Sequence, residues 1–167
     1  MKILSLDPGI EITGWACMDG LRLLECATIR PFDNREHATD RINGICAGLL
    51  RLLSELGPAV VLIEWDSGHV NRKRHKGGGA GLATHGAVTA ALWREAVHWA
   101  RGRQGAEVVP VDENLWTRGV PKDVRALAVA AEYVTYPQES DIGCNIADAI
   151  GLAVWWARER RVRGLAI

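Results

Sequence analysis

A short apolar run that ends in an acidic residue is the most constraining feature of this sequence. Ile3 to Leu6 is nearly continuous in apolar side chains, which is typical of a strand buried on both faces, and Asp7-Pro8-Gly9 ends it in a turn. Residues 10–16 then alternate like the return strand of a hairpin. The carboxylate of Asp7 is therefore expected at the end of a buried strand, where a charge without a partner is strongly destabilising.

Two interpretations of Asp7 follow from this position. In the simpler one, its side chain makes an Asx-turn with the backbone that follows. In the other, a cation, a hydrogen-bond network or a metal ion neutralises it. The second gains weight because residues 60–64 form another fully apolar strand that also ends in an acid, Glu64.

The rest of the pattern predicts a single α/β domain over residues 1–167, in which helices flank a mixed five-stranded sheet. Two further strands are expected at residues 21–29 and 107–111. Helical spacing and stop signals predict four helices, the first capped by Asn34: residues 35–56, 81–101, 121–133 and 145–161.

Composition excludes several classes of protein. Twenty basic and 20 acidic residues give a formal net charge of zero, so no overall field attracts nucleic acid or acidic membranes. The N-terminus reaches Asp7 too soon for a signal peptide, and no apolar stretch is long enough to span a membrane. Four scattered cysteines without a CxxC pair favour reduced thiols in a cytoplasmic protein over zinc ligands or disulfides: Cys17, Cys26, Cys46 and Cys144. We expect no organic cofactor.

A basic, glycine-rich stretch after Glu64 has no periodicity and is predicted to be a loop. It is not a phosphate-binding loop, because no Gly-Lys-Ser/Thr follows its glycines. It is either a solvated loop or a contact to nucleic acid phosphates, in which case binding would depend on salt and little on sequence. Its basic residues are Arg72, Lys73, Arg74, His75 and Lys76.

A third acid, Asp148, lies in the first turn of the last predicted helix. If the strands ending in Asp7 and Glu64 are neighbours, their ends lie about 5 Å apart, and a helix crossing that end would add Asp148. Three carboxylates so close favour divalent cations between them, and oxygen ligands indicate Mg²⁺ or Mn²⁺. Two such ions support phosphodiester hydrolysis.

Each acid also has a structural interpretation. Glu64 could pair with a lysine or arginine at its strand end. Asn145 and Asp148 have the spacing of a capping box, in which Asn145 is the N-cap. Lys122 and Arg125, by contrast, lie where positive charge opposes the helix dipole, which suggests that these cations are needed for something else.

Taken together, these pieces resemble the RuvC-type Holliday junction resolvases of the ribonuclease H-like superfamily. The resemblance covers almost the whole chain in order and spacing. It is carried by Ile3-x-x-Leu6-Asp7-Pro8-Gly9, Thr13-Gly14-Trp15, Ile63-Glu64 and Ala147-Asp148-Ala149-Ile150-Gly151-Leu152-Ala153. It implies a Mg²⁺-dependent homodimeric endonuclease, bacterial or phage-encoded, that makes paired symmetric nicks in four-way DNA junctions.

The resemblance also assigns residues. Asp7, Glu64 and Asp148 would be ligands of two Mg²⁺ ions, which Mn²⁺ could replace. The family's fourth ligand, usually Asp or His, falls at Asn145, and Asp141 could compensate for the weaker charge there. Lys122, with Arg118 as a neighbour, would hold the scissile phosphate. Arg125, in the same predicted helix as Lys122, is a further expected DNA contact. The family's aromatic wedge falls at Ser67, so Trp65 or His69 would take that role, or the wedge is absent.

Two further expectations concern assembly and alternatives. A four-way junction offers two equivalent strands, which suits a C2 dimer, and the small-residue helix at 81–101 is the candidate interface. The alternative function is a non-catalytic junction- or RNA-binding module on the same fold, which Asn145 favours. A sugar-kinase-like or ATPase fold is a third interpretation, but the chain is too short to supply the second lobe that encloses ATP.

Overall fold

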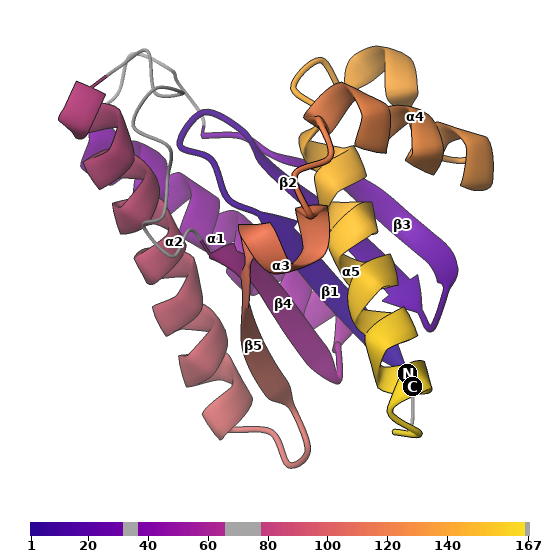
Figure 1. Ribbon diagram of the computed structural model, residues 1–167. Coiled ribbons are helices and arrows are strands. Elements are labelled where there is room, and N and C mark those ends of the chain that lie inside the picture. Colours follow the sequence, from indigo (N-terminus) through magenta and orange to yellow (C-terminus); the bar gives the residue numbers. More distant parts are fainter. Residues whose placement is uncertain (32–36, 66–77, 166–167) are drawn as a thin grey trace.

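The computed structural model describes residues 1–31, 37–65 and 78–165, with side chains described except at 78–82. In this part of the chain, five strands form one sheet in the order β3-β2-β1-β4-β5 (Figure 1). The strands are β1 (Lys2–Asp7), β2 (Thr13–Asp19), β3 (Arg22–Ile29), β4 (Val60–Trp65) and β5 (Glu107–Asp112). β1, β2 and β3 pair antiparallel, whereas β1, β4 and β5 are parallel, so the predicted mixed sheet is confirmed.

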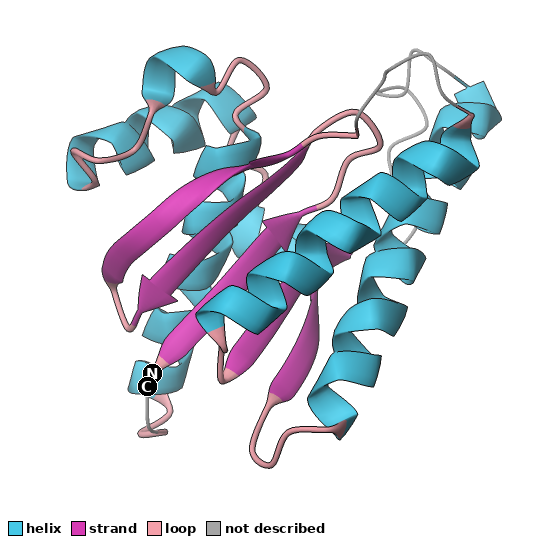
Figure 2. Ribbon diagram, turned by 180° about the vertical axis from the view of Figure 1, so that it is seen from behind, coloured by secondary structure: helices cyan, strands magenta, loops and turns pink. Residues whose placement is uncertain are grey.

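Helices cover both faces of the sheet (Figures 1 and 2). One face carries α1 (Ala38–Leu56) and α2 (Gly78–Arg101). The other carries α5 (Asn145–Val162), with α3 (Glu113–Thr117) and α4 (Lys122–Glu132) packed beside it. A 3₁₀ turn at Gln138–Ser140 precedes α5. No helix in the described part of the chain has the length and apolarity needed to cross a bilayer.

The two layers explain why β1 is continuously apolar. Ile3 belongs to the core cluster under α5, while Leu4 and Leu6 belong to the cluster under α1 and α2. Because successive side chains of a strand point to opposite faces, a strand covered on both sides needs apolar residues at every position.

The last helix lies directly on the strands that end in acids. Ser5 of β1 donates a hydrogen bond from Oγ to the carbonyl oxygen of Ala149 in α5, with an O···O distance of 2.6 Å. Leu6 and Ile63 are partners in the parallel pairing of β1 and β4, so Asp7 and Glu64 follow at the same end of the sheet. This confirms that the two acidic strands are neighbours.

Local differences from the sequence expectations have simple causes. The return strand begins at Thr13 rather than residue 10, because Thr13 Oγ1 binds both the amide and the carbonyl of Gly9 and closes a wider turn. α1 begins at Ala38 with His37 as N-cap, and the predicted cap Asn34 lies outside the described residues. The short α3 was not predicted, because five residues are too few to show helical periodicity.

The capping-box interpretation of Asn145 is wrong. The N-cap of α5 is Cys144, which adopts a left-handed conformation with φ 52° and makes no side-chain cap. Asp141 does this work instead: its Oδ2 accepts a hydrogen bond from the amide of Ala147 at 2.9 Å. Asn145 and Asp148 are thereby left available for other contacts.

Gly14 lies where β2 closely approaches the start of α5. A Cβ at this position would overlap the backbone carbonyl of Asn145 and lie 2.8 Å from the nitrogen of Ile146. We expect Gly14→Ala to lower the free energy of unfolding by about 2 to 3 kcal/mol, since backbone cannot yield as a side chain would. Urea denaturation measures this.

Gly102→Ala is the matched control, because its Cβ would meet only the carbonyl oxygen of Trp99, at 3.7 Å. Equal stability of the two variants would contradict the close packing of β2 against α5.

Candidate active site

Three oxygen atoms from distant parts of the chain converge on the ammonium group of Lys122. Nζ donates to Oδ2 of Asp7 and to Oδ1 of Asn145, each at 3.0 Å, and lies 3.0 Å from Oδ2 of Asp148. Asp7 ends β1, Lys122 begins α4, and the other two lie in the first turn of α5. The sheet and two helix N-termini thus bring these groups to one point.

Asp148 is the most deeply buried of these acids, with a side chain only 2% exposed. Arg125, one turn after Lys122, binds it with two parallel hydrogen bonds: Nε to Oδ1 at 2.9 Å and Nη2 to Oδ2 at 2.8 Å. Such bidentate pairs are among the strongest hydrogen bonds in proteins. The charge of Asp148 is therefore compensated within the protein.

Glu64 is held by a different element. Its Oε2 accepts a hydrogen bond at 2.9 Å from the indole Nε1 of Trp116, which lies on α3. The same indole ring carries the guanidinium of Arg125 at 4.8 Å from its centroid, a cation–π contact. Trp116 therefore links Glu64 to Arg125, the partner of Asp148.

Burial dominates the electrostatics of the site. It raises the pKa of Asp7 to about 6, with Asp148 adding to the rise and Lys122 opposing it. Burial likewise raises the pKa of Glu64 well above its usual range, and the charges of Asp7, Asp148 and Glu113 add to this. Burial lowers the pKa of Lys122, but the two aspartates more than compensate, so its pKa lies above the ordinary value. The carboxylates thus repel one another and attract cations.

The donor set matches what a divalent cation requires. Carboxylate and amide oxygens are the ligands that Mg²⁺ and Mn²⁺ prefer, and Asp7, Asn145 and Asp148 already surround a positive charge. Within the described residues, no three acidic, histidine or cysteine side chains are arranged to hold a metal ion as they stand. Lys122 Nζ lies between the two aspartates, 3.0 Å from an oxygen of each.

No protein-family model matches the chain. A crossover junction endodeoxyribonuclease RuvC from Magnetococcus marinus is 34% identical over 68 residues, which cover 38% of this chain and 37% of that protein. A Thermus thermophilus RuvC in complex with a Holliday junction substrate superposes with a TM-score of 0.73 at 21% identity, over 97% of this chain and 96% of that one.

The chain has the fold of the RuvC-type Holliday junction resolvases. A yeast mitochondrial Holliday junction resolvase shares it with a TM-score of 0.64 at 13% identity, over 95% of this chain and 80% of that one. The resemblance predicted from the sequence is therefore confirmed, together with the fold class. The matched segment spans about two fifths of the length of the curated RuvC relatives.

The resolvase fold brings together five of the residues singled out from the sequence: Asp7, Glu64, Lys122, Asn145 and Asp148. Asp141 is engaged elsewhere. Its Oδ2 accepts from the hydroxyl of Tyr136 at 2.8 Å as well as from the amide of Ala147, so this oxygen orients the start of α5.

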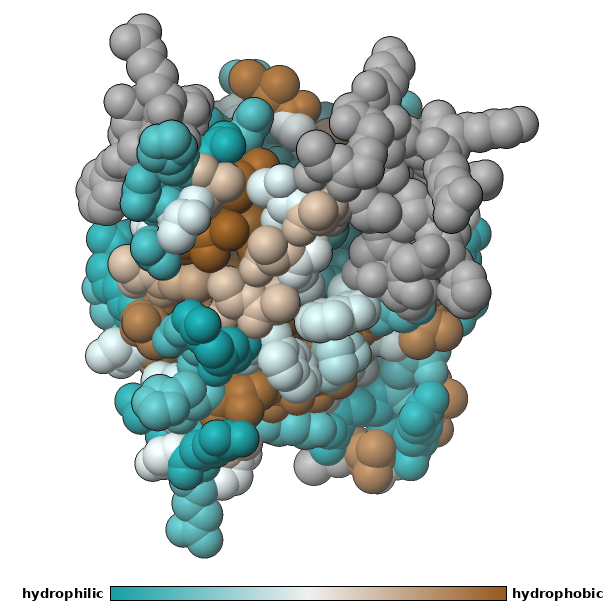
Figure 3. Space-filling model, turned by 90° about the vertical axis from the view of Figure 1, so that its left-hand side faces the viewer, coloured by the Kyte–Doolittle hydropathy of each residue, from teal (hydrophilic) through white to brown (hydrophobic). Residues whose placement is uncertain are grey.

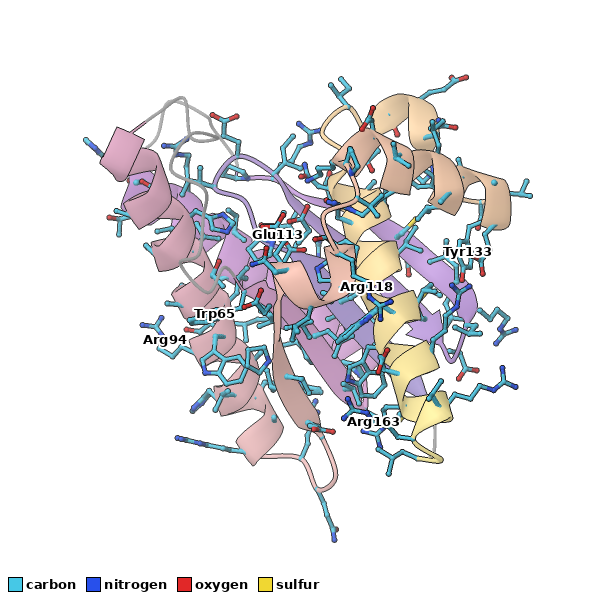
Figure 4. All side chains as sticks on the ribbon, in the orientation of Figure 1. Trp65, Arg94, Glu113, Arg118, Tyr133 and Arg163 are labelled. Atoms are coloured by element: carbon cyan, nitrogen blue, oxygen red, sulfur yellow. The ribbon has the colours of Figure 1, made fainter. Side chains whose placement is uncertain are left out.

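The basic residues predicted to hold DNA separate into three groups. Arg125 points inward to Asp148 and the carbonyl of Val120. Arg118 is largely exposed beside α5, 3.8 Å from Glu159 (Figure 4). The stretch Arg72, Lys73, Arg74, His75 and Lys76 lies outside the described residues, as do Ser67 and His69. Trp65 is partly exposed and packs edge-on against Trp93, with 6.3 Å between ring centroids.

Sequence reasoning missed Glu113 and Trp116. Both lie on α3, which starts where β5 ends, and Glu113 lies at the same end of the sheet as the other acids (Figure 4). A signal was present in the sequence, because the acidic pair Asp112-Glu113 follows a predicted strand in the same way as Asp7 and Glu64. The hydrogen bond from Trp116 had no such signal, since it depends on how α3 turns back over the sheet.

The Arg125–Asp148 pair yields a stability prediction. Arg125→Met retains most of the side-chain volume but leaves Asp148 buried without its bidentate partner. We expect the free energy of unfolding to fall by about 3 kcal/mol, as is typical when one member of a buried ion pair is removed. Urea denaturation at pH 7 measures the loss.

Arg158→Met is the matched control, because Arg158 pairs with Glu132 at the surface, with side chains 57% and 47% exposed. It should change stability by less than about 1 kcal/mol. An equally small loss of unfolding free energy in Arg125→Met would show that the buried carboxylate of Asp148 does not require Arg125 for its stabilisation.

Proposed function

We propose that this protein is a structure-selective DNA endonuclease that resolves four-way junctions by metal-dependent phosphodiester hydrolysis. The observation that carries the proposal is the convergence of buried acids on one cation at the end of the sheet, on the fold of the RuvC-type resolvases. Asp7 and Asp148 share Lys122 instead of being paired at separate places.

Asp7 and Glu64, with Asp148 and Asn145 beside them, are the residues we propose to hold a divalent cation, Mg²⁺ or Mn²⁺. A bound divalent cation lowers the pKa of a water molecule and stabilises charge on phosphate oxygens. Burial already favours this role, because it raises the pKa of Asp7 and Glu64 and so makes a neutralising cation favourable. We leave Asp141 out of the ligand set, since its Oδ2 holds the start of α5.

Lys122 would bind the DNA strand that is cut. Its side chain is 40% exposed, so the ammonium group reaches solvent while it contacts the buried aspartates. A phosphodiester drawn to this charge would lie next to the carboxylates. Arg118, which is exposed and only weakly paired, would contact a phosphate further away. The basic stretch at residues 72–76, which lies outside the described residues, would also contact phosphates.

The first experiment tests cleavage. A synthetic four-way junction incubated with the protein and Mg²⁺ should be nicked at symmetric positions in two strands of like polarity. Asp7→Asn should reduce the rate on the order of 1,000-fold, because it removes a charge that neutralises the cation. Asp19→Asn is the control, since Asp19 lies at the opposite end of the sheet, in β2.

Equal rates for the parent and Asp7→Asn would refute the nuclease proposal. Tight, salt-sensitive junction binding without nicking at any Mg²⁺ or Mn²⁺ concentration would instead support the second candidate, a non-catalytic junction- or RNA-binding module. The neutral Asn145 favours that candidate.

We also propose that the protein acts as a homodimer through α2. Exposed small residues recur along this helix at Ala83, Gly86, Ala87 and Ala90, where another helix backbone could approach closely. Figure 3 looks at the side that carries α2, and tan and white atoms of weakly hydrophobic or neutral residues form a band there among teal hydrophilic ones. Two active sites related by a two-fold axis would match the two equivalent strands of a junction.

Light scattering at micromolar concentration tests the dimer. The parent should have twice the mass of the chain, and Ala90→Glu should halve it, because a charge would be buried on the two-fold face. Ala131→Glu, on the exposed side of α4, should leave the mass unchanged. A parent protein of monomer mass would contradict the proposed interface.

A further inference from the structure

We infer that the site takes a single divalent cation, and that the ammonium group of Lys122 occupies the place a second one would need. The inference rests on the proposed endonuclease function, which supplies the reason for a metal ion. The sequence led us to expect two ions. In the structure, several oxygens of the site already accept hydrogen bonds from Lys122 and Arg125.

Lys122 Nζ has the contacts of a bound cation. Three oxygens lie 3.0 Å from it: Oδ2 of Asp7, Oδ1 of Asn145 and Oδ2 of Asp148. These oxygens come from a strand and a helix that are more than a hundred residues apart in the sequence, so the fold itself places them around one positive charge. A metal ion at the same point would lie within repulsive distance of the ammonium group.

Asp148 is committed to the two basic side chains. Both of its oxygens accept hydrogen bonds from Arg125, and Oδ2 also contacts Lys122. In contrast, the hydrogen bonds described for Asp7 and Glu64 use Oδ2 and Oε2. Asp7 Oδ1 and Glu64 Oε1 remain for a metal ion, and one or two carboxylates with water and phosphate oxygens are the usual protein share of a Mg²⁺ site.

The neutral side chain of Asn145 suits the position that the ammonium group of Lys122 occupies. Its amide oxygen accepts a hydrogen bond from Lys122 Nζ but carries no charge for a second metal ion. At this position, in the first turn of α5, an aspartate would add a third negative charge around the same point, beside those of Asp7 and Asp148. The neutral Asn145 and the inward-pointing Lys122 are therefore complementary features of one site.

Mn²⁺ titration of the full-length chain, followed by electron paramagnetic resonance, tests the inference without reference to activity. We expect one Mn²⁺ per chain, with the spectrum of an isolated ion. Lys122→Met should raise the ratio to two and produce the spin-coupled spectrum of a neighbouring pair. Lys122→Gln provides a second uncharged variant in case the first does not fold, and circular dichroism establishes folding.

Lys2→Met is the matched control, because Lys2 lies at the opposite end of β1 from Asp7 and its Nζ donates to the carbonyl oxygen of Leu56. It should keep the ratio at one. A coupled pair in the parent protein would overturn the inference, and so would a ratio of one in a folded Lys122 variant. In either case junction nicking could still be observed, so the one-ion inference and the nuclease proposal fail separately.

Discussion

The structure depends on the neutralisation of buried acids at one end of its sheet. Asp7 and Asp148 are almost inaccessible to solvent, and burial of an uncompensated carboxylate is strongly unfavourable. Lys122 and Arg125 supply the compensation from α4, while Asn145 adds a neutral oxygen acceptor. Electrostatic contacts therefore act together with apolar packing in positioning α4 and α5 relative to β1.

Around these groups lies a second layer that orients them. Trp116 donates to Glu64 and supports the guanidinium of Arg125 on its ring, so a single indole positions groups at both the β4 and the α5 side of the cluster. Asp141 fixes the first turn of α5 through the amide of Ala147. Such outer contacts restrict the rotamers of the acids, which a site for an ion and a phosphate requires.

The RuvC-type fold accounts for the position of the cluster, and this chain's own residues account for its charge. β1 and β4 run parallel, so both deliver an acid to the same edge, and α5 crosses that edge with Asp148. At that edge the neutral Asn145 accepts a hydrogen bond from Lys122, so these two side chains set part of the charge of the cluster.

The sequence by itself determined the five strands, the four longer helices and three of the acids, Asp7, Glu64 and Asp148. Continuous apolar runs that end in Asp7 and Glu64 fix buried strands, because only apolar residues suit a strand covered on both faces. What only the tertiary structure decided is which atoms meet. Lys122 and Asp7 are 115 positions apart, and Trp116 reaches Glu64 across 52. Such pairings depend on the packing of α3, α4 and α5 on the sheet, which local residue patterns do not encode.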